Sequence, residues 1–152
     1  MRKVLVLCVA LASCGRSADV ASGLRVQLVA SGWRPAAAGG RNKLVPSASI
    51  HVMNVSDTTL PSVQVNAVFH RVGEDGEWGS AFAAAAGSSG LTPGGGATLV
   101  LDSARGYTGD DPQELMLHNR QFVDVTVDVF AKYGSRQWTR VAAFPIDRHL
   151  LK

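Results

Sequence analysis

The stretch Phe122-Val123-Asp124-Val125-Thr126-Val127-Asp128-Val129 decides the fold class of this chain. Its four valines recur at a spacing of two, and two aspartates and a threonine stand between them. Because successive side chains of a strand point to opposite faces, the pattern predicts a strand with one buried valine face and one solvated face. The turn sequence Tyr133-Gly134-Ser135 predicts that residues 137–144 return as its hairpin partner.

The same alternation of apolar and polar residues predicts further short strands on both sides of this one. Trp33-Arg34-Pro35 is expected to end the first strand, and residues 36–42 are expected to form a loop. In residues 62–72 both faces carry apolar side chains, which predicts a strand in the middle of a sheet. In the strand expected at residues 77–86, Trp78 and either Ala81 or Phe82 should face inward. The expected strands are residues 24–28, 47–55, 62–72, 77–86, 97–101, 122–129 and 137–144, with a closing segment at 146–151.

About seven short strands and very little helix predict an all-β fold, a single antiparallel β-sandwich over residues 24–152. The one expected helical turn covers residues 112–117, because Asp111 followed by Pro112 suits the start of a helix. The length fits one domain with its own core.

The N-terminus has the layout of a secretory signal peptide. Arg2 and Lys3 precede an apolar run over residues 4–12, and small residues follow it. Leu11-Ala12-Ser13-Cys14 resembles the lipobox of bacterial lipoproteins, where the chain is cut before a cysteine that carries diacylglycerol. The resemblance implies a signal peptide at residues 1–13 and a lipidated N-terminus with a short tether at residues 14–23. The alternatives are an ordinary cleaved signal or an uncleaved anchor, although the run is shorter than the roughly 20 residues that span a bilayer.

The lipobox resemblance also implies a location. A lipid on Cys14 would anchor the domain to a membrane of the bacterial cell envelope, facing the periplasm. Gly15, rather than Asp, follows the cysteine. By the sorting rule of enteric lipoproteins, this residue favours the outer membrane over the inner one.

A second resemblance concerns the middle of the chain. Asn54-Val55-Ser56, then Leu60, then Leu91-Thr92-Pro93-Gly94 resemble the turn and strand-entry motifs of bacterial immunoglobulin-like domains. The resemblance implies that the sandwich is immunoglobulin-like. It implies no activity.

The charge balance and the cysteines exclude some classes of function. Without Arg2 and Lys3, 13 basic residues face 12 acidic ones, and no basic run is present, so nucleic acid is not an expected partner. Cys8 would leave with the signal peptide and Cys14 would carry lipid. The domain would then have no thiol for a disulfide, a metal or nucleophilic catalysis.

Several histidines and carboxylates are candidates for metal binding or catalysis. His51 and His70 could face each other across neighbouring strands and bind a metal ion, but solvent-facing positions are the favoured interpretation. Glu114 and His118 could share a helical face near Asp110 and Asp111 and hold a divalent cation, but the favoured interpretation is that the helix dipole stabilises acids at the start and a histidine at the end of the helix. Asp124 and Asp128 would lie about 13 Å apart on one strand face, too far to act on one bond, and could instead pair with Arg136 and Arg140. No nucleophile or phosphate-loop motif occurs. We therefore expect no enzyme, cofactor or metal.

The expected function is that of a membrane-anchored protein-interaction or assembly module with an envelope protein as partner. The alternative is a module that binds a small ligand, a glycan or a divalent metal ion. Loops as long as residues 104–119 are usually functional, and Arg105, Tyr107 and Met116 are of types enriched in interfaces, so they are the predicted partner-binding residues. Alternatively, Leu115 and Leu117 close the open end of the sandwich.

Overall fold

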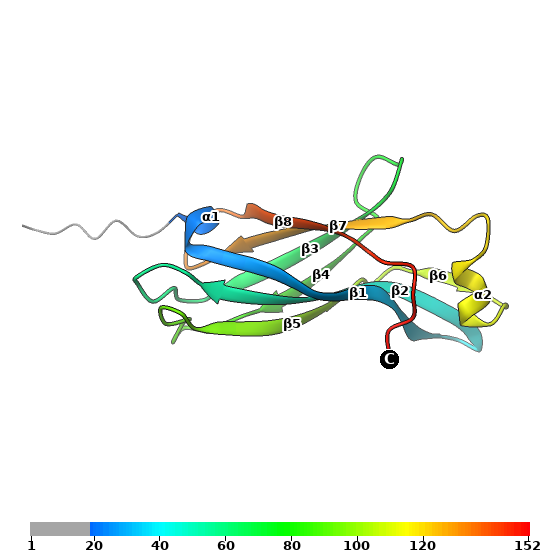
Figure 1. Ribbon diagram of the computed structural model, residues 1–152, viewed down its shortest axis with the longest axis horizontal. Coiled ribbons are helices and arrows are strands. Elements are labelled where there is room, and N and C mark those ends of the chain that lie inside the picture. The colour runs from blue at the N-terminus through cyan, green and yellow to red at the C-terminus, as the bar shows by residue number, and fades with distance from the viewer. Residues whose placement is uncertain (1–18) are drawn as a thin grey trace, which may run out of the picture.

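The computed structural model describes residues 19–152, and these form two four-stranded antiparallel sheets packed face to face (Figure 1). One sheet has the order β1-β2-β5, with β6 also paired to β2, and the other has the order β4-β3-β7-β8. The strands are β1 (Leu24–Ala38), β2 (Arg41–Asn54), β3 (Gln64–Arg71), β4 (Gly79–Ala84), β5 (Gly96–Asp102), β6 (Tyr107–Gly109), β7 (Val125–Lys132) and β8 (Thr139–Pro145). The described residues thus contain eight strands where about seven were expected.

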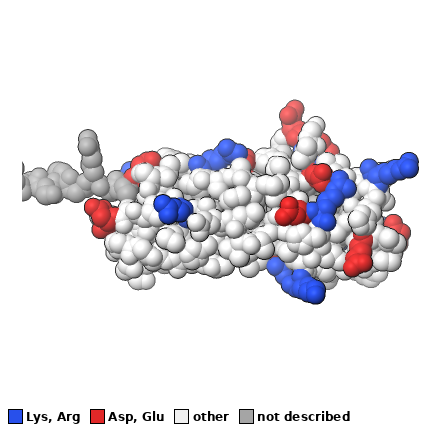
Figure 2. All heavy atoms as spheres, in the orientation of Figure 1, with Lys and Arg blue, Asp and Glu red and all other residues white. Residues whose placement is uncertain are grey.

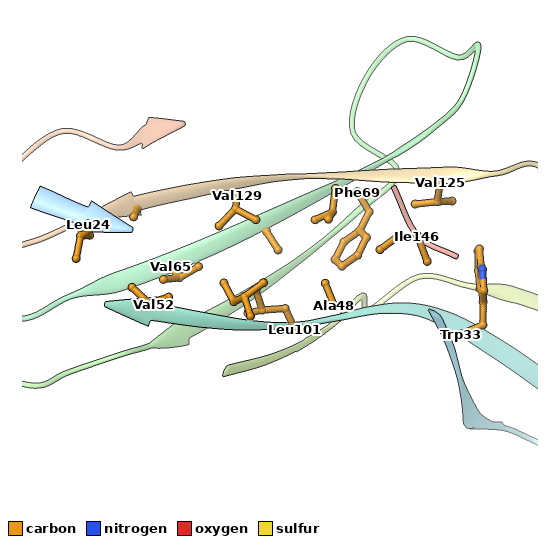
Figure 3. Packing of buried hydrophobic residues seen from close by; sticks show 14 of the residues in the cluster. Leu24, Trp33, Ala48, Val52, Val65, Phe69, Leu101, Val125, Val129 and Ile146 are labelled. Carbon is orange, nitrogen blue, oxygen red and sulfur yellow. The ribbon is translucent and has the colours of Figure 1, made fainter. Parts of the chain in front are cut away.

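The core lies between the two sheets and confirms the valine pattern. Val125, Val127 and Val129 on β7 are buried, and the residues between them are more exposed (Figure 3). Val123 precedes the strand and is half-buried. As expected, β3 lies between two neighbours, β4 and β7, and its inward side chains are fully buried.

The first hairpin is much longer than the sequence predicts. β1 continues through Pro35 to Ala38, the turn falls at Gly39-Gly40, and β2 begins at Arg41. Pro35 is tolerated because Trp33, two residues earlier, donates its N–H to His149 outside the β1–β2 ladder. By the strand's period of two, the nitrogen of Pro35 also faces away from β2, so its missing N–H breaks no ladder bond.

The structure decides one open alternative and corrects one boundary. Trp78 and Ala81 pack against the core, as expected, whereas Phe82 on β4 is 62% exposed and points away from it. The helical turn, α2 (Gln113–Leu117), starts one residue later than expected. Its N-cap is Pro112, and no side chain caps it.

The packed part of the chain starts earlier than the predicted boundary at Leu24. Residues Val20–Gly23 form the short helix α1, and Val20 is 2% exposed within the core. α1 and α2 lie at opposite ends of the elongated molecule (Figure 1). Cys14 and the predicted signal peptide lie outside the described residues. Within residues 19–152, no helix is long and apolar enough to cross a bilayer.

Candidate interaction surface

Four aromatic rings from separate parts of the chain meet at the α2 end. Trp33 of β1 is fully buried, and its ring centroid lies 4.6 Å from that of Phe122 and 5.7 Å from that of Tyr107. Tyr107 of β6 also lies 4.7 Å from Phe122 and 5.1 Å from Trp78. Aromatic pairs at such separations stabilise beyond the area that they bury. We call these four residues the aromatic cluster.

Polar contacts hold the rim of the aromatic cluster. The Tyr107 hydroxyl donates to the carbonyl oxygen of Val123 and accepts from its N–H, both at 3.3 Å. Arg148 lies with its guanidinium carbon 5.0 Å from the centre of the Phe122 ring and donates to the carbonyl oxygens of Leu117 and Phe122. Its hydrogen bond to Asp124 raises the pKa of Arg148 above its usual value, so the arginine stays charged. The segment from α2 to β7 is therefore fixed to the C-terminal segment.

A shallow pocket opens beside the cluster, between β6 and α2. Its volume is about 140 Å³. Apolar side chains form part of its wall and amide and carboxylate side chains the rest. The lining residues are Tyr107, Thr108, Gly109, Asp111, Met116, Asn119, Gln121 and Phe122.

The structure brings two of the three predicted partner-binding residues together. Tyr107 is half-buried and Met116 is 6% exposed, and both line this pocket. Arg105 is exposed and lines a different hollow, beside Trp78. Leu117 is buried at the end of the core and Leu115 is 58% exposed, so only one of the two leucines closes the end of the molecule.

Sequence reasoning missed the rest of this surface. Trp33 and Trp78 come from distant strands, and no local pattern connects them with Tyr107. Phe122 was assigned to the first position of a strand, but it precedes β7 and packs into the aromatic cluster. Asn119 belongs to the predicted functional loop but was not singled out, and Gln121 carried no sequence signal.

The histidines do not meet. His51 lies on β2 with Nδ1 3.1 Å from the Thr98 hydroxyl, and His70 lies in the other sheet, where Nε2 is 3.6 Å from a carboxylate oxygen of Asp128. The less favoured alternative, in which they face each other across neighbouring strands, is therefore wrong. In residues 19–152, no group of three or more His, Cys, Asp or Glu side chains is arranged to hold a metal ion.

The two aspartates beside the β7 valines have separate partners. Asp128 pairs with Arg140 on the returning strand at 2.7 Å, as expected. Asp124 pairs with Arg148 instead. The guanidinium of Arg136 lies over the Tyr133 ring, 5.6 Å from its centre.

Comparison with known proteins adds little. No protein-family model and no curated protein matches this chain. A solved structure described as "X-ray structure of Northeast Structural Genomics Consortium target SoR45" is similar at a TM-score of 0.45 and 11% identity, over 84% of this chain and 89% of that one. A likeness at this level carries no argument about function.

Proposed function

We propose that this chain is a lipid-anchored protein of the bacterial cell envelope, acting as a non-catalytic interaction module with an immunoglobulin-like sandwich. The lipid would be carried by Cys14, in the sequence Leu11-Ala12-Ser13-Cys14. The partner would be another envelope protein. It would bind the α2 end, where the aromatic cluster lies, through Arg105, Tyr107 and Met116, together with the exposed Leu115.

The observation that supports this proposal is that α1, where the described residues begin, and the aromatic cluster lie at opposite ends of the molecule. Five residue steps separate Cys14 from Asp19, a reach of about 17 Å, so a lipid there would hold the α1 end near its membrane. The pocket between β6 and α2 lies at the other end (Figure 1). An anchor at one end leaves the other end accessible to a protein partner.

The pocket between β6 and α2 suits one side chain of a protein partner better than a drug-sized molecule, whereas a wider, open hollow of about 500 Å³ lies on the other side of α2, beside Leu117 and His118. The pocket's volume of about 140 Å³ is below the roughly 300–1,000 Å³ that drug-sized ligands occupy. It is large enough to receive one side chain of a partner. Buried anchors of this kind dominate the energy of many protein interfaces.

Palmitate labelling tests the anchor. The full chain is expressed in a bacterium with labelled palmitate, beside a Cys14→Ala variant. We expect the label to be lost in the variant, because it lacks the thiol that would carry the diacylglycerol. We expect the detergent-phase partitioning to be lost as well, because the acyl chains are what would bind the detergent. Labelling that survives the substitution contradicts the anchor.

Site-specific photo-crosslinking tests the partner surface independently. A photoreactive residue replaces Leu115 at the α2 end, which is 58% exposed. The control variant carries it in place of Val29 on β1, which is 60% exposed. We expect a discrete protein adduct in envelope preparations from position 115 and none from position 29. The same adducts from both positions would place the interaction elsewhere.

A further inference from the structure

The described residues contain five edge strands, because β6 pairs only with β2 as β5 does. β6 is three residues long, and the edges of β1, β4 and β8 are each bonded at one residue or interrupted. On β1, the backbone of Trp33 bonds to His149 and Leu151 of the C-terminal segment. On β4, the Ser80 carbonyl oxygen accepts from the N–H of Ala104. β8 has a register shift opposite Val129 and Phe130 and ends in a proline. Such devices keep a sheet edge from pairing with another chain.

The edge of β5 has no such cover. Asn54 donates its N–H to Gly95, and Ser103 donates to Pro46, which places odd-numbered β5 residues in hydrogen-bonded pairs with β2. Because these pairs alternate, the N–H and C=O groups of the even-numbered residues point away from the sheet. Among residues 19–152, none makes a backbone hydrogen bond to these outward groups. The outward residues are Gly96, Thr98, Val100 and Asp102.

The side chains leave this edge equally open. Thr98 and Val100 are exposed, the latter at 53%, and the strand contains neither proline nor lysine. No charged residue occurs between positions 78 and 101, a run that includes all of β4 and β5 except Asp102. The lower margin of the molecule, where β5 runs, correspondingly shows only uncharged atoms along its left half (Figures 1 and 2). An exposed strand edge of this composition is a template for another strand.

We propose that β5 pairs antiparallel with β5 of a second copy of this chain, about a two-fold axis at Leu99. This register pairs all seven residues of the strand. Thr98 then lies opposite Val100, a favourable cross-strand pair, and Asp102 lies opposite Gly96, so no like charges meet. A symmetric interface requires a surface that is complementary to itself, and this strand is.

The pairing satisfies the open edge of both copies. The four outward residues of each strand exchange about eight hydrogen bonds with the other strand, and the two β1-β2-β5 arrays become one continuous sheet. Antiparallel pairing also makes the two α1 ends point in opposite directions along the dimer. The inference does not depend on lipid at Cys14, but two such anchors would hold the dimer with its long axis along the membrane.

Cysteine cross-linking tests the register. The full chain with Cys8→Ser and Cys14→Ser, purified in detergent, receives one new cysteine at a time under mild oxidation. Leu99→Cys should give the strongest disulfide-linked dimer, because it opposes itself at a Cα separation of about 4.5 Å, within disulfide range. Thr98→Cys and Val100→Cys should cross-link poorly alone and well when mixed. Equal yields from all three, or a yield at 99 no higher than that of Val29→Cys, overturn the pairing.

Sedimentation equilibrium tests the dimer itself. Thr98→Pro removes an N–H that faces away from β2, so it should give a monomer whose melting temperature lies within a few degrees of the wild type. Thr98→Val removes the contact with His51 but keeps the edge N–H, and should remain a dimer. A wild type that stays monomeric at high concentration overturns the proposal. If a peptide of residues 96–102 nevertheless shifts the NMR amide signals of β5 in that monomer, the edge binds a strand of another protein, and the proposed dimer is still overturned.

Discussion

The side-chain amide of Asn54 donates to the backbone carbonyl oxygen of Leu91 at 2.8 Å. This bond lies at the end of the core near α1, because Asn54 pairs with Leu24, the residue that follows α1. The same amide donates to the carbonyl oxygen of Thr58 at 2.8 Å, and its oxygen accepts from the N–H of Ser56 at 2.9 Å. Asn54 is fully buried, and Leu91 forms an isolated bridge with Leu60. One side chain thus ties the end of β2 to both the turn that follows it and the approach to β5.

Replacing Asn54 should destabilise the domain markedly. Asn54→Ala removes the hydrogen bonds of a fully buried side chain and leaves the carbonyl oxygen of Leu91 with only the bond from the N–H of Leu60, at a cost of about 3 kcal/mol. Urea unfolding measures this loss. Ser56→Ala is the matched control, because it removes only the hydroxyl at the more exposed side of the same turn, and should cost about 1 kcal/mol. Equal losses would show that the turn, rather than the buried bond to Leu91, is what stabilises this end.

Gly106 holds the start of β6 against β2. A Cβ atom there would overlap the carbonyl oxygen of Leu44, which is backbone and cannot move aside alone. We expect Gly106→Ala to cost several kcal/mol, since it must displace the segment that carries Tyr107. Thermal unfolding of Gly106→Ala beside Gly87→Ala, where the added Cβ meets no atom within 4 Å, checks this. If the two variants melt together, β6 can shift freely and the pocket has no fixed shape.

The sequence predicts the parts of this fold that depend on local alternation. β7 and β3 were readable because their inward positions are apolar at a strict period of two. The extent of β1 was not readable, since the rule that proline ends a strand depends on which way the missing N–H faces. Pro35 faces away from β2 at an edge, a fact that only strand pairing determines.

The candidate site was predictable only in part, for a related reason. Loop length and composition drew attention to Tyr107 and Met116, and both line the pocket. The surroundings that make Tyr107 a packed residue come from Trp33 and Trp78, more than 25 positions away along the chain in each case. Contacts between such distant segments leave no mark in a short window of sequence.

The two faces of β7 should respond differently to the same new charge. Val127 is fully buried, so Val127→Asp places an unpaired carboxylate in the core and should cost several kcal/mol, enough to unfold a domain with a stability of about 5–15 kcal/mol. Thr126→Asp puts the same group on the outer face, opposite His70, and should cost about 1 kcal/mol. Circular dichroism during urea titration separates the two. Comparable losses would mean that the outer face of this sheet is covered as well.

Tyr107, Arg105 and Leu115 should separate into a packed residue and two accessible ones. Tyr107 contacts three other rings of the aromatic cluster, so Tyr107→Ala should cost about 3 kcal/mol. Tyr107→Phe keeps the ring and loses the hydroxyl's bonds to Val123 and Arg71, so it should cost about 1 kcal/mol. Arg105→Ala and Leu115→Ala change exposed side chains and should stay within about 0.5 kcal/mol of the wild type. Calorimetric unfolding of the four variants measures these differences.

Only the variants that keep wild-type stability can then report on binding. Loss of the crosslinked partner in Arg105→Ala or Leu115→Ala, at an unchanged melting temperature, would assign those side chains to the interface. Loss in Tyr107→Ala alone would reflect the disturbed cluster. A Tyr107→Ala variant as stable as the wild type would contradict the packing described for this end, and its effect on binding could then be attributed to the Tyr107 side chain itself.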